Sequence, residues 1–153
     1  MEKTEIPVKP AAALATARSL PIALLRAREK VMGPIRAMLA NAGVTEQQWR
    51  VLRVLAERGT TDPKDLAQAA SLLNPSLTRI MQLLEKKGLI VRKDHPSDRR
   101  KVLLDITEEG RALLRRAAPE SNAIFARLEE RFGRERMDQL LDLLNDLSEL
   151  ELE

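Results

Sequence analysis

The sequence predicts a mainly α-helical protein with one short β-hairpin, and the stretch 62–107 carries this prediction. Two short helices are expected here, because Asp62–Pro63 and Asn74–Pro75 each offer an N-cap residue followed by a proline suited to the first helical position. Gly88 then supplies the left-handed conformation that often ends a helix. Beyond it, LIVRK and KVLLDI alternate as two strands joined by the basic turn DHPSDRR. Two helices followed by such a hairpin form a winged helix-turn-helix.

The second helix of the pair has two chemically different faces. Its apolar positions recur at spacings of three and four, which predicts a buried stripe of Leu77, Ile80, Met81 and Leu84. On the other face, Arg and Gln can reach guanine and adenine edges in a major groove, and small hydroxyl side chains suit phosphates. A solvated helix face is the alternative for any one of them. The residues predicted to contact DNA are Asn74, Pro75, Ser76, Thr78, Arg79 and Gln82.

Composition excludes several classes of protein. The chain has 153 residues, 44% hydrophobic and 32% charged, which is typical of a globular domain. It has no cysteine, which excludes disulfides, thiolate zinc sites and thiol redox sensing, and with one histidine we expect no metal and no cofactor. Nucleophile–base arrangements are equally scarce, so we expect no enzyme. We find no membrane span and no signal-peptide pattern, and expect a cytoplasmic protein.

Positive charge is concentrated in the predicted DNA-binding stretch. The whole chain carries a net charge of +3, yet the segment 62–101 alone contains nine Lys or Arg against five acidic residues. After Arg136 every charged side chain is acidic. A positive field over this segment is what binding to the phosphate backbone requires.

Two helices are expected before the pair, at 20–42 and 45–58. The Gly33–Pro34 pair should bend the first of them or remove a backbone hydrogen bond. The second begins with a capping box, Thr45–Gln48. Its core side should hold Trp49, Leu52 and Leu55. Trp49, the only tryptophan, is interpreted as a core residue, with a ligand contact as the alternative.

Two more helices are expected after the hairpin. Thr107 caps the first, with Glu108 and Glu109 favourable to the helix dipole and Pro119 a site for a kink. The pattern breaks at Phe132–Gly133. A final helix then carries a wide apolar face made of Met137, Leu140, Leu141, Leu144, Leu147 and Leu150.

These outer helices exceed what a winged domain needs, and a wide apolar face must be covered by something, which predicts a homodimer. Two recognition helices about one DNA turn apart would then contact a pseudo-palindromic operator. The predicted organisation is an N-terminal arm at 1–18, a helical dimerisation region at 19–44 and 107–153, and a winged helix-turn-helix DNA-binding domain at 45–106.

The chain from Ser19 to Leu150 resembles the MarR family of bacterial winged-helix regulators. The matching pieces are LAQAASLLNPSLTRIMQLLEKKGLIVR and the wing DHPSDRRKVLLDITEEG. In the wing, Asp98-x-Arg100 followed by LxIT is similar to the family signature. More narrowly, SLPIALLRARE, TEQQWRVLRVLAE and PSLTRI resemble the regulators of homoprotocatechuate (3,4-dihydroxyphenylacetate) degradation operons.

The resemblance implies a homodimer whose second motif helix enters the major groove of double-stranded DNA. It also implies that Arg100 reaches the adjacent minor groove while Asp98 orients it, and that Arg99 contacts phosphates. In such proteins an aromatic acid or phenol binds between the dimer helices and the winged domain, and repression is lost. Because guanidinium pairs with carboxylate and indole stacks on rings, the predicted ligand contacts are Arg26, Arg28 and Trp49.

The predicted function is a dimeric, sequence-specific transcriptional regulator, a repressor of an aromatic-compound degradation operon that its effector releases from the operator. The alternative is a winged-helix dimer that binds DNA non-specifically, or binds protein, without sensing a small molecule. Binding without sequence preference would distinguish the two. His95, the only histidine, is expected to be a solvent-exposed turn residue or an occasional phosphate contact.

Overall fold

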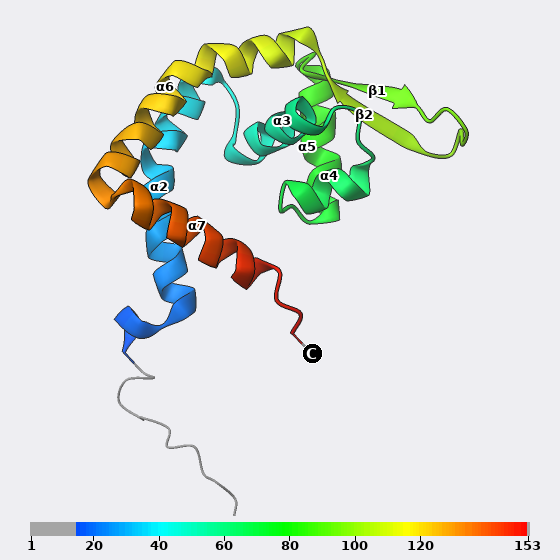
Figure 1. Cartoon of the computed structure of the whole chain (residues 1–153). Coiled ribbons are helices and arrows are strands. Elements are labelled where there is room, and N and C mark those ends of the chain that lie inside the picture. Colours follow the sequence, from blue (N-terminus) through cyan, green and yellow to red (C-terminus); the bar gives the residue numbers. More distant parts are fainter. Residues whose placement is uncertain (1–14, 153) are drawn as a thin grey trace, which may run out of the picture. The chain divides into compact units, whose positions relative to one another are not determined.

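The computed structural model describes residues 15–152 (Figure 1). The chain divides into two compact units, residues 1–34 and 35–153, and we describe each by itself. Because the description starts at residue 15, most of the predicted N-terminal arm (1–18) lies outside the described residues. The predicted division into a DNA-binding domain and a dimerisation region stays a prediction.

The first unit contains a short 3₁₀ turn, η1 (Thr16–Arg18), and the first part of helix α2 (Leu20–Ala42). The bounds of α2 are those predicted from the sequence, and the helix runs through Pro34. Arg26 and Arg28 both lie exposed on this part of α2.

The second unit begins with the remainder of α2 and continues with five helices and a two-stranded antiparallel sheet. The elements are α3 (Glu46–Arg58), α4 (Pro63–Ala69), α5 (Asn74–Lys86), β1 (Ile90–Asp94), β2 (Val102–Ile106), α6 (Glu108–Phe132) and α7 (Arg134–Ser148). The mainly helical class and the helix–turn–helix–hairpin order predicted from the sequence are confirmed.

Three predicted helix starts are stabilised by side-chain caps. The capping box at Thr45 is complete, because its Oγ1 accepts from the Gln48 backbone N–H while Gln48 Oε1 accepts from the Thr45 N–H. At the start of α4, Asp62 Oδ1 accepts from the Asp65 N–H at 3.0 Å, and this bond is the main reason that the pKa of Asp62 is lowered. Thr107 caps α6 in the same way.

The predicted N-cap at Asn74 is wrong by one residue. Leu73 is the N-cap of α5; its side chain makes no capping bond, and its carbonyl accepts from the Leu77 N–H at 3.0 Å. Asn74 is thus the first helical residue and Pro75 the second. A proline fits there because the N–H groups of the first turn have no acceptor within the helix.

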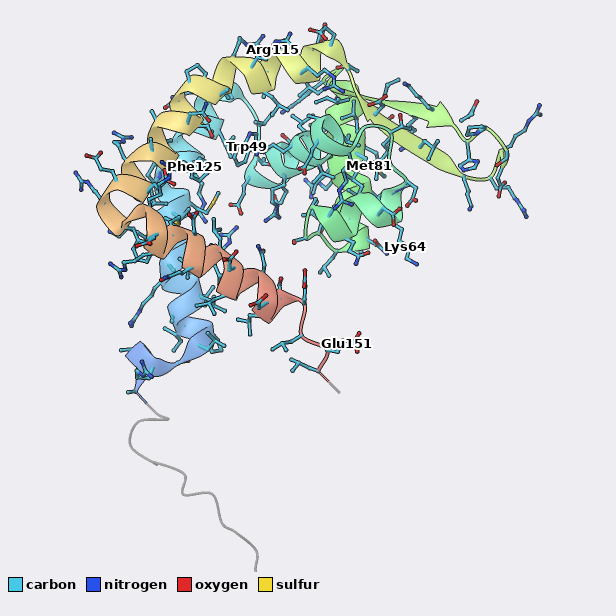
Figure 2. All side chains as sticks on the ribbon, viewed as in Figure 1. Trp49, Lys64, Met81, Arg115, Phe125 and Glu151 are labelled. Carbon is cyan, nitrogen blue, oxygen red and sulfur yellow. The ribbon has the colours of Figure 1, made fainter. Side chains whose placement is uncertain are left out.

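Helix α3 lies at the centre of the second unit and packs against α4, α5, α6 and β2. Its buried side holds Val51, Leu52 and Leu55, none of which is exposed to solvent. The predicted stripe of α5 is also buried (Leu77, Ile80, Met81 and Leu84). Trp49 does not join this core as predicted: it is only half-buried on α3 (Figure 2).

The hairpin follows directly from the end of α5. Gly88 adopts φ of 73°, as predicted for the residue that ends this helix. Lys87 is the C-cap of α5, and its Nζ donates to Gly43 O and Gln48 Oε1. Strand β1 pairs with β2 in a register that places Ile90 opposite Ile106. Thr61 adds a bridge to Leu104, which ties the loop before α4 to the sheet.

Helix α6 runs through Pro119 and curves along its length (Figure 1). It ends at Gly133, and α7 follows. Leu150 lies beyond α7, which ends at Ser148, so the predicted final helix was too long by two residues. No residue of α7 is buried, and it leaves leucines exposed (Leu140, Leu141, Leu143 and Leu147).

None of the helices within residues 15–152 is long and apolar enough to cross a membrane.

Gly110 lies where α6 approaches the backbone before β1 and the side chain of Ile106 too closely for a larger residue. A Cβ there would lie 2.4 Å from Leu89 O and 2.6 Å from Ile106 Cγ1, so backbone would have to move. We expect Gly110→Ala to lower the free energy of unfolding by about 1–3 kcal/mol, the usual cost of overpacking, measured by urea unfolding. Glu109→Ala is the control, since Glu109 is exposed in the same turn. Equal stability of the two variants would contradict the prediction.

Candidate functional site

The exposed face of α5 carries the residues predicted to contact DNA. All six are exposed, while the apolar stripe of the same helix is buried. Thr78, Arg79 and Gln82 share one side of the helix, because they are separated by one, three and four positions. The sequence prediction that these side chains point away from the core is confirmed; their contact with DNA remains a prediction.

The turn between β1 and β2 presents two arginines. Arg99 and Arg100 are exposed, and the side chain of Arg100 is 93% exposed. Asp98 Oδ1 accepts from the Arg100 backbone N–H at 3.0 Å and from Arg100 Nε at 3.4 Å. This is the geometry expected if Asp98 orients Arg100.

His95 differs from its prediction. It is half-buried rather than fully exposed, and its Nδ1 accepts from the backbone N–H groups of Ser97 and Asp98, each at 3.2 Å. Sequence reasoning missed this role because it depends on the turn curling back over the ring.

Charged side chains also hold the stem of the hairpin. Asp105 Oδ2 accepts from Lys93 Nζ at 2.9 Å and from Thr60 Oγ1 at 3.2 Å, while Oδ1 accepts from the Ile106 N–H. The bond from Lys93 is the main cause that lowers the pKa of Asp105. Asp105 therefore joins both strands to the loop that precedes α4.

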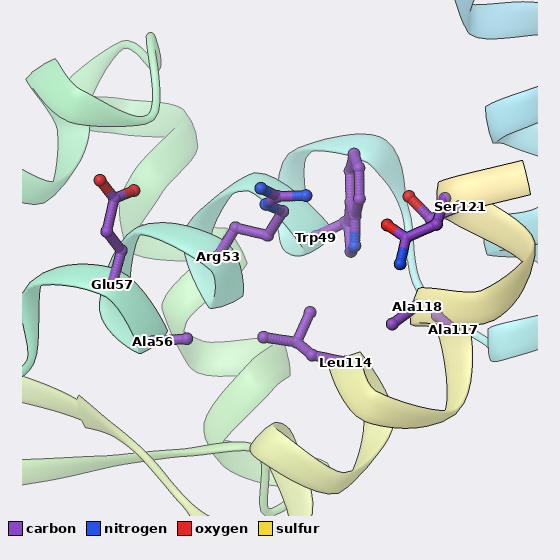
Figure 3. Close-up of a pocket in the computed structure, with 9 residues that line it drawn as sticks. Trp49, Arg53, Ala56, Glu57, Leu114, Ala117, Ala118 and Ser121 are labelled. Carbon is purple, nitrogen blue, oxygen red and sulfur yellow. The ribbon is translucent and has the colours of Figure 1, made fainter. Parts of the chain in front are cut away.

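A cavity of about 420 Å³ lies between α3 and α6 in the second unit (Figure 3). One wall is formed by Trp49 and Arg53 of α3, with the Arg53 guanidinium 5.2 Å from the centre of the indole ring. The α6 wall is apolar at Leu114, Ala117 and Ala118 and polar at Ser121 and Asn122. Glu57 of α3 also lines the cavity, so the lining carries one guanidinium and one carboxylate. The indole and the Arg53 guanidinium suit a small molecule with an aromatic ring and an anionic group.

Of the three predicted ligand contacts, one lines this cavity, and its contact with a ligand remains a prediction. Trp49 lines the cavity, whereas Arg26 and Arg28 lie in the first unit, with Arg28 Nη1 3.8 Å from Glu29 Oε1. Sequence reasoning missed Arg53. Its spacing of four residues from Trp49 was the available signal, because residues four apart share a helix face.

Comparison with known proteins identifies the family. Residues 44–102 match the MarR family model. The transcriptional regulator FarR of Neisseria gonorrhoeae is 45% identical over 133 residues, which cover 87% of this chain and 91% of FarR. The homoprotocatechuate degradative operon repressor of Escherichia coli is 42% identical over 128 residues, covering 84% and 86% of the two chains. The chain belongs to the MarR family.

Solved structures agree with this assignment. The structure of NadR in complex with 4-hydroxyphenylacetate has a TM-score of 0.80 and 42% identity, covering 95% of this chain and 100% of NadR. The structure of CouR bound to a 23-mer DNA duplex has a TM-score of 0.80 and 31% identity, covering 89% and 96%. This MarR-family chain therefore has the winged-helix fold predicted for it and is a transcriptional regulator, not an enzyme.

The Asp105 site of this MarR-family protein predicts a pH-dependent stability. Since the folded pKa is lowered, the stabilisation is present above the unfolded value of about 4 and is lost as pH falls through the folded pKa. We expect Asp105→Asn to lower the free energy of unfolding by about 1 kcal/mol at pH 7, and the difference to shrink towards pH 3. Urea unfolding across pH measures this. Asp94→Asn, on the exposed end of β1, is the control; a difference for Asp105→Asn that stays constant with pH would contradict the prediction.

Proposed function

We propose that this regulator is a homodimeric repressor that binds a pseudo-palindromic operator and is released by a small aromatic acid or phenol. The observation that carries the proposal is that one helix connects two surfaces. Helix α3 packs against α5, whose exposed face is polar, and the same helix lines the cavity with Trp49 and Arg53. A ligand in the cavity would thus lie against a helix that supports the DNA-binding elements.

For DNA, the proposal places α5 in the major groove and the hairpin turn in the adjacent minor groove. Arg79 and Gln82 would contact base edges, and Asn74, Pro75, Ser76 and Thr78 would lie at the phosphates or bases beside them. Arg100, held by Asp98, would enter the minor groove, where a narrow groove enhances the negative potential. Arg99 would contact phosphates. The structure of the relative CouR bound to a 23-mer DNA duplex supports DNA binding by this fold.

For assembly, the proposal assigns the exposed leucines of α7 to contact with a second copy of the chain. Leu140, Leu141, Leu143 and Leu147 are between 37% and 66% exposed. Large exposed apolar areas are typical of an interaction surface. The predicted dimerisation region, 19–44 and 107–153, would flank the DNA-binding domain at 45–106. A two-fold dimer then requires half-sites about 34–36 Å apart.

For the effector, the cavity supplies complementary groups. The Arg53 guanidinium could pair with a carboxylate, the indole of Trp49 could stack on a ring, and Ser121 or Asn122 could hydrogen-bond a phenol. The complex of NadR with 4-hydroxyphenylacetate and the name of the Escherichia coli relative support a phenolic acid. Arg26 and Arg28 remain predicted contacts.

The proposed mechanism is a shift between two dimer geometries. The effector can shift the balance only by its different affinities for the DNA-binding and the released state. A tenfold loss of operator affinity requires about 1.4 kcal/mol of coupling.

The DNA contacts predict two distinguishable mutant effects. Arg79→Ala should cost about 1–3 kcal/mol of operator binding and relax preference at one base position, because a base contact is lost. Arg99→Ala should weaken operator and scrambled DNA alike and reduce the salt dependence, because a phosphate contact is lost. Fluorescence anisotropy over a salt series, with DNA from upstream of the protein's own gene and scrambled DNA, measures both. Equal binding of the wild type to both DNAs would instead favour the non-specific alternative.

The cavity predicts ligand binding that can be followed without DNA. Because Trp49 is the only tryptophan, 3,4-dihydroxyphenylacetate or 4-hydroxyphenylacetate should change the intrinsic fluorescence, and the same compound should weaken operator binding. Arg53→Gln should weaken ligand binding by about 1.5–3 kcal/mol, the worth of a hydrogen bond to a charged group, while operator binding is retained. Arg58→Gln is the control, because Arg58 is the last residue of α3 and does not line the cavity. Ligand binding that leaves DNA affinity unchanged would contradict the mechanism.

A further inference from the structure

The turn between β1 and β2 is organised around one imidazole ring. His95 Nδ1 lies 3.2 Å from the backbone nitrogens of Ser97 and Asp98 and 3.2 Å from Ser97 Oγ. The two backbone groups can only donate, so Nδ1 must accept. An accepting Nδ1 carries no proton, which is the arrangement of the Nε2–H tautomer.

These bonds continue to the exposed arginine at the tip. The Asp98 N–H is held by His95, and Asp98 Oδ1 in turn accepts from the N–H and Nε of Arg100. The Asp98 carbonyl also accepts from the Lys101 N–H at 3.1 Å, which closes the turn. Because the Arg100 side chain is 93% exposed, packing does not fix its direction, and Asp98 is the group that does.

The ring also lies beside a hollow that the start of α4 borders. His95 lines a hollow of about 430 Å³ together with the start of α4 and the start of β2. The lining residues are Asp62, Pro63, Lys64, Lys101, Val102 and Leu103. The imidazole is half-buried and not fully exposed.

We infer that His95 is a positioning residue for DNA recognition: its Nδ1 fixes Asp98, and Asp98 sets the direction in which Arg100 meets the DNA. The inference rests on the proposed function, in which Arg100 contacts the operator. His95 itself need not touch DNA.

If His95 acts in this way, operator affinity should depend on where the side chain places its hydrogen-bond acceptor and not on the presence of an imidazole ring. Asn places an oxygen where His has Nδ1, whereas Gln places one nearer to Nε2. His95→Asn should keep operator affinity within about twofold, and His95→Gln and His95→Ala should lose about fivefold to tenfold, as expected for one or two net hydrogen bonds. Operator anisotropy measures the affinities, and thermal unfolding verifies that each variant is folded.

A double-mutant cycle with Arg100→Ala separates this role from general loss of stability. If His95 acts through Arg100, His95→Gln should have little further effect once Arg100 is removed. An equal loss in both backgrounds would overturn the inference, as would wild-type affinity in His95→Gln.

The proton on the ring gives a readout independent of DNA. Since His95 is the only histidine, the imidazole region of a long-range ¹H–¹⁵N correlation spectrum contains one spin system from the chain. At a pH where the ring is neutral, the spectrum should show the Nε2–H tautomer; the Nδ1–H tautomer would overturn the inference. A wild type that binds operator and scrambled DNA equally would overturn the proposed function as well, whereas specific binding that is unaffected in His95→Gln overturns only this role.

Discussion

Burial of one side of α3 is the interaction on which the rest of the second unit depends. Val51, Leu52 and Leu55 are completely buried, and each such side chain contributes about 1.5–3 kcal/mol relative to exposure. Since α4, α5, α6 and β2 all pack on this helix, their mutual positions follow from it. The same helix presents Trp49 and Arg53 to the cavity, so the core and the proposed effector site share one rigid element.

The hairpin combines strands anchored in the core by Ile90, Leu104 and Ile106 with an exposed basic turn held by hydrogen bonds. Its stem depends on Asp105, which joins Lys93 and Thr60, and its turn depends on His95 and Asp98. Individually such exposed bonds contribute little stability. Together they fix the direction of the arginines, and phosphates and groove edges are recognised only when the arginines have a defined orientation. The proposed repressor would therefore recognise DNA with one surface fixed by packing and another fixed by hydrogen bonds.

Local sequence rules succeeded where short-range interactions decide the structure. The caps at Thr45, Asp62 and Thr107 form as predicted because donor and acceptor lie within one helical turn. The rule failed at Asn74, where Leu73 takes the N-cap position without a side-chain capping bond. Lys87 donates to Gly43 and Gln48, which lie far from it in the sequence and which local rules do not identify.

The sequence by itself determined the helices, the hairpin, the buried stripe of α5 and the basic turn, because periodicity, caps and the Gly88 stop are local properties. The family signature in the wing added the expected partnership of Asp98 with Arg100. Only the tertiary structure decided that Arg53 and Trp49 face Ser121 and Asn122 across a cavity, since α3 and α6 meet only after the chain has folded. It also decided that the His95 ring accepts hydrogen bonds from the backbone of its own turn and lines one hollow together with the starts of α4 and β2. Contacts between residues far apart in sequence leave no periodic signal in a single chain.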